Sequence, residues 1–127
     1  GLVGPAGPLA LFYEKLLAGD FLSSLSKEKM VRPTREGKLD ATFGQIVDFG
    51  LGVMLHRSSH DPATVPYGFG SLAGQGAFGH GGARSSIAFA DPTAGFTAAV
   101  FLNGRVPETE HQPRMRTLLD LLRSELA

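Results

Sequence analysis

Amphipathic patterns near the two ends of the chain predict helices. Apolar residues recur at three- and four-residue spacing between Pro8 and Leu17, which is typical of a helix with one apolar face, and Gly19 offers a stop. A similar stripe predicts a C-terminal helix, formed by Met115, Leu118, Leu119, Leu121, Leu122 and Leu126. Ser26, which precedes a short charged run, predicts an N-cap and one helical turn that ends before Pro33.

The middle of the chain carries strand and loop patterns. Small and large residues alternate from Phe49 to His56, which predicts one partly buried strand. Two β-compatible runs, 85–90 and 96–102, flank an Asp-Pro-Thr-Ala-Gly turn and predict an antiparallel hairpin. The stretch from Thr34 to Asp40 reads as charged and solvated, and the segment from Arg57 to Gly82 reads as a long loop because Gly, Pro, Ser and Asp dominate it.

The order helix, strand, loop, hairpin, helix predicts an α+β fold. We expect the N- and C-terminal helices to cover one face of an antiparallel sheet. The 127 residues form one domain or part of one, and no internal repeat occurs. The chain begins with Gly1 and not with methionine, as a piece cut from a longer protein would.

The amino-acid composition limits the classes of partner that the chain is expected to bind. There are 12 basic and 12 acidic side chains, so the formal net charge is zero and we expect no nucleic-acid partner. No apolar run approaches the roughly 20 residues of a membrane-spanning helix, so we expect no membrane partner. The absence of cysteine excludes disulfides and thiol chemistry but fits any compartment, which leaves the localisation open.

Two patterns resemble ligand-binding motifs without the context those motifs need. Gly74-x-Gly76-x-x-Gly79 has the spacing of a dinucleotide fingerprint, but a loop precedes it and a strand follows it. We therefore expect no cofactor and interpret the glycines as a loop that turns and approaches a sheet closely. His56, His60 and Asp61 do not lie on a helix, so their spacing does not predict a metal site.

Two Ser-x-x-Lys spacings, Ser24 to Lys27 and Ser26 to Lys29, match the pattern in which a lysine activates a serine nucleophile. That chemistry needs a buried lysine at the start of a buried helix. The residues that follow are charged and end at Pro33, so we interpret both serines as capping and surface residues.

One segment, Phe78 to Ala83, combines an imidazole with exposed backbone. Glycines flank His80 on both sides, and residues without side chains leave their amide groups accessible. Accessible amides can bind an oxyanion or an extended ligand, and an imidazole beside them could donate a hydrogen bond to a substrate oxygen.

The run from Phe78 to Asn103 resembles the last hairpin of serine β-lactamase-like hydrolases, which include class C β-lactamases, penicillin-binding proteins, D-aminopeptidases and related esterases. Its His-Gly-Gly stands where other members carry Lys-Thr-Gly or His-Thr-Gly. The run 7–17 resembles the family's helix before a Leu-Ser to Arg-Pro segment, here 25–33, and Phe49-Gly50-Leu51-Gly52 resembles its Tyr-Gly-Leu-Gly strand. The resemblance covers nearly the whole chain and implies the C-terminal part of a β-lactamase/transpeptidase-like fold.

The resemblance also implies roles for five residues. His80 lines the active-site cleft and contacts substrate, while Gly81 and Gly82 give the substrate room. The backbone amide of Ala83 supplies one of two oxyanion-hole donors, and Arg84 reaches a substrate carboxylate.

The departures from the family pattern matter equally. The family's Ser-x-x-Lys and Tyr-x-Asn motifs precede everything matched here, and Asn103, the chain's single asparagine, ends the last strand. We therefore expect this chain to be the C-terminal part, 1–127, of a hydrolase whose nucleophile lies in a missing N-terminal part.

Two functions of different classes follow. In the first, the parent is a serine hydrolase that forms an acyl-enzyme on small esters, amides or β-lactams, and the missing part or self-association covers an apolar face of this chain. In the second, the chain is a non-catalytic module that binds a protein or peptide at its sheet edge. A hydrolase with a nucleophile elbow is disfavoured, because no Gly-x-Ser-x-Gly occurs.

Overall fold

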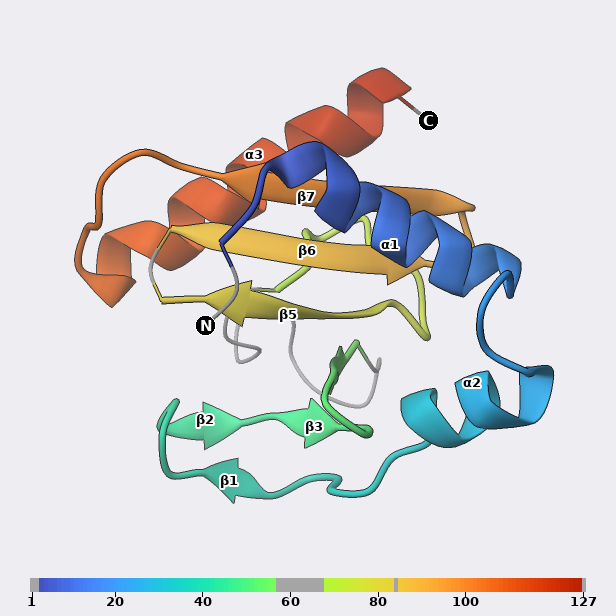
Figure 1. Cartoon of the computed structure of the whole chain (residues 1–127). Helices are drawn as coiled ribbons and strands as arrows, with labels where there is room; N and C mark the ends of the chain where they lie inside the picture. Colours follow the sequence, from blue (N-terminus) through green and yellow to red (C-terminus); the bar gives the residue numbers. More distant parts are fainter. Residues whose placement is uncertain (1–2, 57–67, 84, 127) are drawn as a thin grey trace.

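The structure, a computed structural model, describes residues 3–56, 68–83 and 85–126. Within this part of the chain, two helices come first, seven strands follow, and a third helix ends it (Figure 1). In chain order they are α1 (Ala6–Ala18), α2 (Ser24–Val31), β1 (Leu39–Asp40), β2 (Gln45–Ile46), β3 (Asp48–Phe49), β4 (Met54–Leu55), β5 (Phe78–Gly82), β6 (Ser86–Asp91), β7 (Phe96–Phe101) and α3 (Glu108–Leu126). None of the helices in the described residues is long and apolar enough to cross a membrane.

The strands form an antiparallel sheet in the order β3-β4-β5-β6-β7, with β1 and β2 as a separate two-stranded ribbon. The predicted hairpin is present as β6 and β7, which pair from Ser86 opposite Phe101 to Asp91 opposite Phe96. Strand β5 extends this hairpin on its other side, from Phe78 opposite Ala90 to Gly82 opposite Ser86. The α+β class is confirmed.

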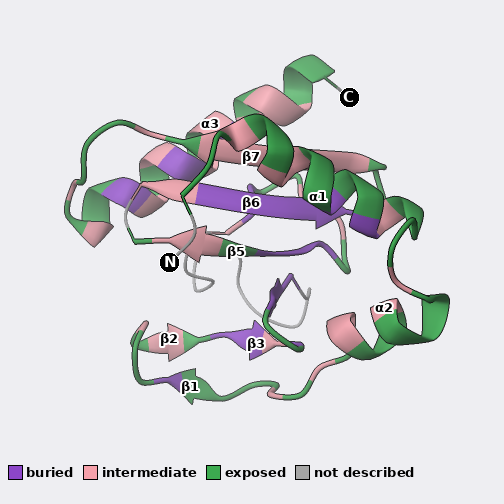
Figure 2. Ribbon diagram, viewed as in Figure 1, coloured by how far each residue is buried: buried purple, intermediate pink, exposed green. Residues whose placement is uncertain are grey.

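The two long helices cover opposite faces of the sheet, so the expectation of a single covered face is wrong. Along β6, Ile87 and Phe89 point into one apolar cluster that α3 completes with Met115 and Leu119. Ala88 and Ala90, which alternate with them, point into a second cluster. Helix α1 completes this cluster with Tyr13 and Leu16. Both faces of β6 are therefore buried, as a central strand between two helical layers requires, and Figures 1 and 2 show α1 and α3 on either side of it.

The predicted strand from Phe49 to His56 is two short strands joined by a tight turn. Phe49 pairs with Met54. The amide of Gly50 donates to the carbonyl of Val53 at 2.9 Å. Gly52 has a φ of 74°, a conformation that side chains disfavour and that turns the chain back on itself. The single strand is therefore wrong, but the expected close approach is present at Gly50, where a Cβ atom would come within 2.2 Å of the Met30 carbonyl oxygen.

The segment assigned to a long loop ends in a strand. Residues 57–67 lie outside the described part, but 78–82 form β5, between β4 and β6 in the sheet. The sequence Phe-Gly-His-Gly-Gly has little strand propensity of its own, so its neighbours on both sides hold it extended. The loop assignment is wrong for these five residues.

The helix boundaries differ from expectation at two ends. The N-cap of α2 is Ser23, whose hydroxyl accepts from the Ser26 amide at 3.2 Å, so Ser26 lies inside the helix. Helix α3 begins at Glu108, well before the first residue of the predicted stripe, and Pro113 lies in its early turns. The Pro107 carbonyl accepts from the amides of Glu110 and His111 at 3.0 and 2.9 Å, which starts the helix there.

Candidate active site

His80 lies on the central strand β5 and faces the same side of the sheet as helix α1. It stands directly across from Ala88, whose side chain belongs to the cluster that α1 covers. The alanine is buried, but the imidazole is exposed. At His80 the strand pairs with β6 on one side only, and the side chain projects into space that the described residues do not fill.

A backbone contact sets the proton arrangement of His80. Its Nδ1 lies 2.7 Å from the carbonyl oxygen of Gly81. A carbonyl oxygen only accepts, so this hydrogen bond requires the proton on Nδ1. In a neutral ring Nε2 then presents a lone pair, and His80 donates to a substrate oxygen only when both nitrogens carry protons.

The residues after His80 form a surface poor in side chains. Gly81 and Gly82 are half-buried, and Ala83 is exposed in the turn that follows β5, one residue beyond the strand end. A Cβ atom at Gly82 would come within 2.2 Å of the Ser86 hydroxyl oxygen, so its absence keeps this end of the sheet open. Arg84 lies outside the described residues.

No pairing of His80 with a nucleophile is present among the residues that the structure describes. Within the part of the chain that the structure describes, His80 makes no hydrogen bond to a serine, threonine or lysine. Ser24 and Ser26 are exposed on α2, which has no buried residue, and Lys27 donates to the Leu17 carbonyl at 2.9 Å. This arrangement matches the interpretation of both Ser-x-x-Lys spacings as surface features.

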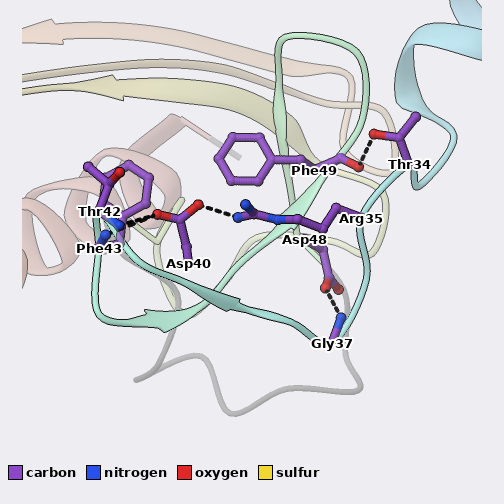
Figure 3. A network of polar contacts seen from close by, with 8 residues as sticks. All are labelled: Thr34, Arg35, Gly37, Asp40, Thr42, Phe43, Asp48 and Phe49. Atoms are coloured by element: carbon purple, nitrogen blue, oxygen red, sulfur yellow. Dashed lines mark hydrogen bonds and ion pairs between the residues drawn. The ribbon is translucent and has the colours of Figure 1, made fainter.

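A polar network lies behind the site, in the stretch expected to be merely solvated. Asp40 is buried and forms an ion pair with Arg35 (Figure 3). Its other oxygen accepts from the amides of Thr42 and Phe43 at 2.9 and 3.0 Å. The hydrogen bond from Arg35 holds the pKa of the Asp40 carboxyl below its usual value, and the Phe43 amide adds to the effect.

The sequence did not predict that Phe49 lies beside His80 or that Arg35 lies over Phe49. The rings of Phe49 and His80 lie with centroids 6.1 Å apart, and the Arg35 guanidinium carbon lies 4.7 Å from the Phe49 ring centroid. Phe49 stands in the Phe-Gly-Leu-Gly run that resembles a family strand, which was the available signal. No local pattern connects Arg35 to that run.

The remaining candidate motifs have structural roles where they are described. Gly76 has a φ of 87°. A Cβ atom at Gly74 would come within 2.8 Å of Asp91, and one at Gly79 within 2.2 Å of the Ala88 carbonyl oxygen. Gly74 and Gly76 thus belong to a loop that turns and approaches the sheet, as interpreted, and Gly79 lies within β5.

His56 belongs to the core. It is 8% exposed, and burial lowers its pKa, although the charge of Asp91 raises it. His60 and Asp61 lie outside the described part. Among the described residues, no group of three or more His, Asp or Glu side chains could hold a metal ion.

An antiparallel sheet between two helical layers, with an exposed histidine and two glycines on an inner strand, defines an α+β domain. The sequence matches the beta-lactamase family model over residues 1–123. The chain therefore belongs to the beta-lactamase family, and the family resemblance is confirmed.

A solved structure supports the fold. The chain resembles a beta-lactamase from Mycobacterium bovis with a TM-score of 0.72 and 24% sequence identity. The match covers 92% of this chain and 42% of that one, so this chain spans less than half the length of its structural neighbour. No curated protein matches the sequence significantly.

Proposed function

We propose that this chain is the C-terminal part of a serine hydrolase that acts through an acyl-enzyme on small esters, amides or β-lactams. The observation that carries the proposal is the exposed His80 imidazole beside side-chain-free backbone, on the central strand of a beta-lactamase family chain. The nucleophilic serine and its lysine belong to a segment that precedes this one in the parent protein.

In this function the chain contributes binding and electrostatic stabilisation. The amide of Ala83 is one of two donors to the oxyanion that forms when a serine attacks a carbonyl. His80 contacts the substrate, Gly81 and Gly82 leave room for it, and Arg84 pairs with a substrate carboxylate. His80, Gly81 and Gly82 act from β5, and Ala83 acts from the position that follows it.

The test compares two substitutions at Ala83 in the parent polypeptide that contains this sequence. Ala83→Pro removes the amide hydrogen, so we expect kcat for p-nitrophenyl acetate or nitrocefin to fall about a hundred- to a thousandfold. Ala83→Gly keeps the amide and serves as the matched control, with near wild-type kcat. Unchanged kcat in a folded Ala83→Pro variant would contradict the oxyanion role.

The position of the nucleophile is tested by labelling with a fluorophosphonate or a fluorescent penicillin. We expect the adduct on a serine of the parent that lies outside the 127 residues of this chain. An adduct on Ser24 or Ser26 would show that the nucleophile lies in this chain and would overturn the proposed division of the site.

In this proposal, the missing part of the parent contacts the face around α1 and β7. An apolar hollow of about 630 Å³ lies there. It is lined by Val3, Gly4, Pro5, Pro8, Leu9, Phe12 and Phe101, here called the α1–β7 hollow. Phe12 and Phe101 are 45% and 51% exposed. We propose that the missing N-terminal part covers this surface in the parent and that self-association covers it in the isolated chain.

A second function is favoured by one observation. Strand β7 is the outer edge of the five-stranded sheet and is six residues long, so one side of its backbone is open to an added strand. A non-catalytic module that binds an extended peptide at this edge would use that backbone. The absence of any labelled serine in the parent would favour this second function.

A further inference from the structure

Phe49 lies between a cation and the imidazole of the candidate site. The Arg35 guanidinium carbon is 4.7 Å from the centroid of its ring, within the range of a cation–π interaction. The His80 ring centroid is 6.1 Å from that of Phe49, with the planes inclined at 50°. An aromatic pair at this separation is attractive and restricts the orientation of the smaller ring.

The backbone of Phe49 is held on the side that carries Arg35. The amide of Phe49 donates to the Arg35 carbonyl at 2.9 Å, and the amide of Arg35 donates back at 3.2 Å. The amide and the hydroxyl of Thr34 also donate to the Phe49 carbonyl, at 2.8 and 3.1 Å. These bonds fix the position from which the Phe49 ring projects, as Figure 3 shows for the hydroxyl of Thr34.

The guanidinium is itself anchored. Asp40 accepts a hydrogen bond from Arg35, and two backbone amides hold the same carboxylate from the other side. The Asp40 side chain is 11% exposed and that of Arg35 is 35% exposed, so the carboxylate is the better shielded partner of this ion pair. The guanidinium therefore keeps its place over the ring.

We propose that Arg35 is a positioning residue for His80, acting through Phe49. Anchored by Asp40, it holds the Phe49 ring beside the imidazole, so that His80 keeps the orientation in which Nδ1 donates to Gly81 and Nε2 is left for a ligand. The neutral ring then suits a ligand group that donates a hydrogen bond, such as an amide N–H or a hydroxyl. This inference rests on the proposed role of His80 at the active site.

The experiment reads the imidazole directly in the full 127-residue chain. Long-range ¹H–¹⁵N correlation spectra report which ring nitrogen of each of the four histidines carries the proton, and a His80→Gln variant assigns the His80 signals. We expect wild-type His80 to show a proton on Nδ1. In Arg35→Gln we expect the His80 ring signals to shift and to show a mixture of the two tautomers. Arg35→Lys keeps the cation, so its His80 signals should fall between those of wild type and Arg35→Gln.

Matched controls separate this effect from general damage. The Arg123 guanidinium lies 5.1 Å from the Phe96 ring centroid and 3.5 Å from Asp91, a similar arrangement of cation, ring and carboxylate that does not include His80. Arg123→Gln should leave the His80 signals unchanged. Phe49→Leu should shift them, and Phe49→Tyr, which keeps the ring, should not.

Folding is followed through the signals of His111, which is fully buried on α3. If Arg35→Gln loses those signals through unfolding, Arg35→Lys and the pair of Phe49 variants decide the question. Unchanged His80 signals in Arg35→Lys and Phe49→Leu would overturn the proposal. The labelling and Ala83 experiments do not depend on this spectrum, so failure of the proposed function and failure of this inference are distinguishable.

Discussion

Gly79 shows how one residue sets the position of the candidate site. It pairs with Phe89 on one side and Met54 on the other, one residue before His80. A Cβ atom there would come within 2.2 Å of the Ala88 carbonyl oxygen and 2.5 Å of the Phe89 Cβ. The first of these neighbours is backbone, so no side-chain rotation relieves the clash.

We expect Gly79→Ala to lower the free energy of unfolding by about 3 kcal/mol or more, because β5 must move away from β6. Urea denaturation followed by circular dichroism measures this. Gly7→Ala is the control: its new Cβ meets nothing within 4 Å in the exposed first turn of α1, and removing a helical glycine should add about 0.5–1 kcal/mol. Equal stabilities of the two variants would contradict the close approach of β5 and β6.

At the scale of elements, the segment from Arg35 to Phe49 combines the buried side chain of Val47 with polar contacts of Asp40 and Asp48. Its two ribbon strands have only two residues each, too few to be stable on their own. The ion pair between Arg35 and Asp40 and the bond from the Gly37 amide to Asp48, at 2.7 Å, connect the ribbon to β3. The segment that supports Phe49 thus depends on ionised carboxylates.

This dependence predicts a pH effect. The pKa of Asp40 is lower in the folded chain than its usual value of about 3.8, so its contribution to stability is complete above that value and is lost as the pH falls through the folded-state pKa. We expect Asp40→Asn to be less stable than wild type near about pH 7 and the difference to shrink toward zero in strong acid. Urea denaturation across this range measures it.

Asp20→Asn is the matched control for this prediction. Asp20 pairs with Lys15 at 3.3 Å, but both side chains are about half exposed, and such pairs contribute little. The free energy of unfolding of the Asp20→Asn variant should equal that of the wild type at every pH. A stability difference for Asp40→Asn that stayed constant into strong acid would show that the loss does not come from ionised Asp40.

At the scale of the whole molecule, the two faces of the sheet are unequally covered. The α3 side has a cluster that includes Phe69, Phe89 and Met115, all nearly fully buried. The α1 side leaves the α1–β7 hollow open and exposes Phe21, whose ring lies 5.4 Å from that of Phe12. This asymmetry supports the proposal that a partner surface covers the α1 side.

We expect the isolated chain to self-associate in a concentration-dependent manner, and Phe12→Ser combined with Phe101→Thr to shift it toward the monomer. Sedimentation velocity at several concentrations measures this. Leu121→Ser is the control, since Leu121 is 57% exposed on α3 and should not alter the association. A wild-type chain that stays monomeric would argue against an uncovered interface and favour the independent binding module.

Local patterns in the sequence determined much of the fold. The three-to-four-residue stripes of α1 and α3 and the Asp-Pro-Thr-Ala-Gly turn between β6 and β7 specify their elements through contacts within a few residues, and all are present. The family resemblance from His80 and its neighbours also arose from the sequence, because a contiguous run carries it.

Only the tertiary structure decided the rest. The glycine-rich β5 is a strand because β4 and β6 hydrogen-bond to it, and the split of residues 49–56 into two strands depends on a left-handed Gly52. The opposite placement of α1 and α3, and the meeting of Arg35 with Phe49 and His80, join residues distant along the chain. Local periodicity carries no information about such contacts, which arise when the layers of the fold assemble.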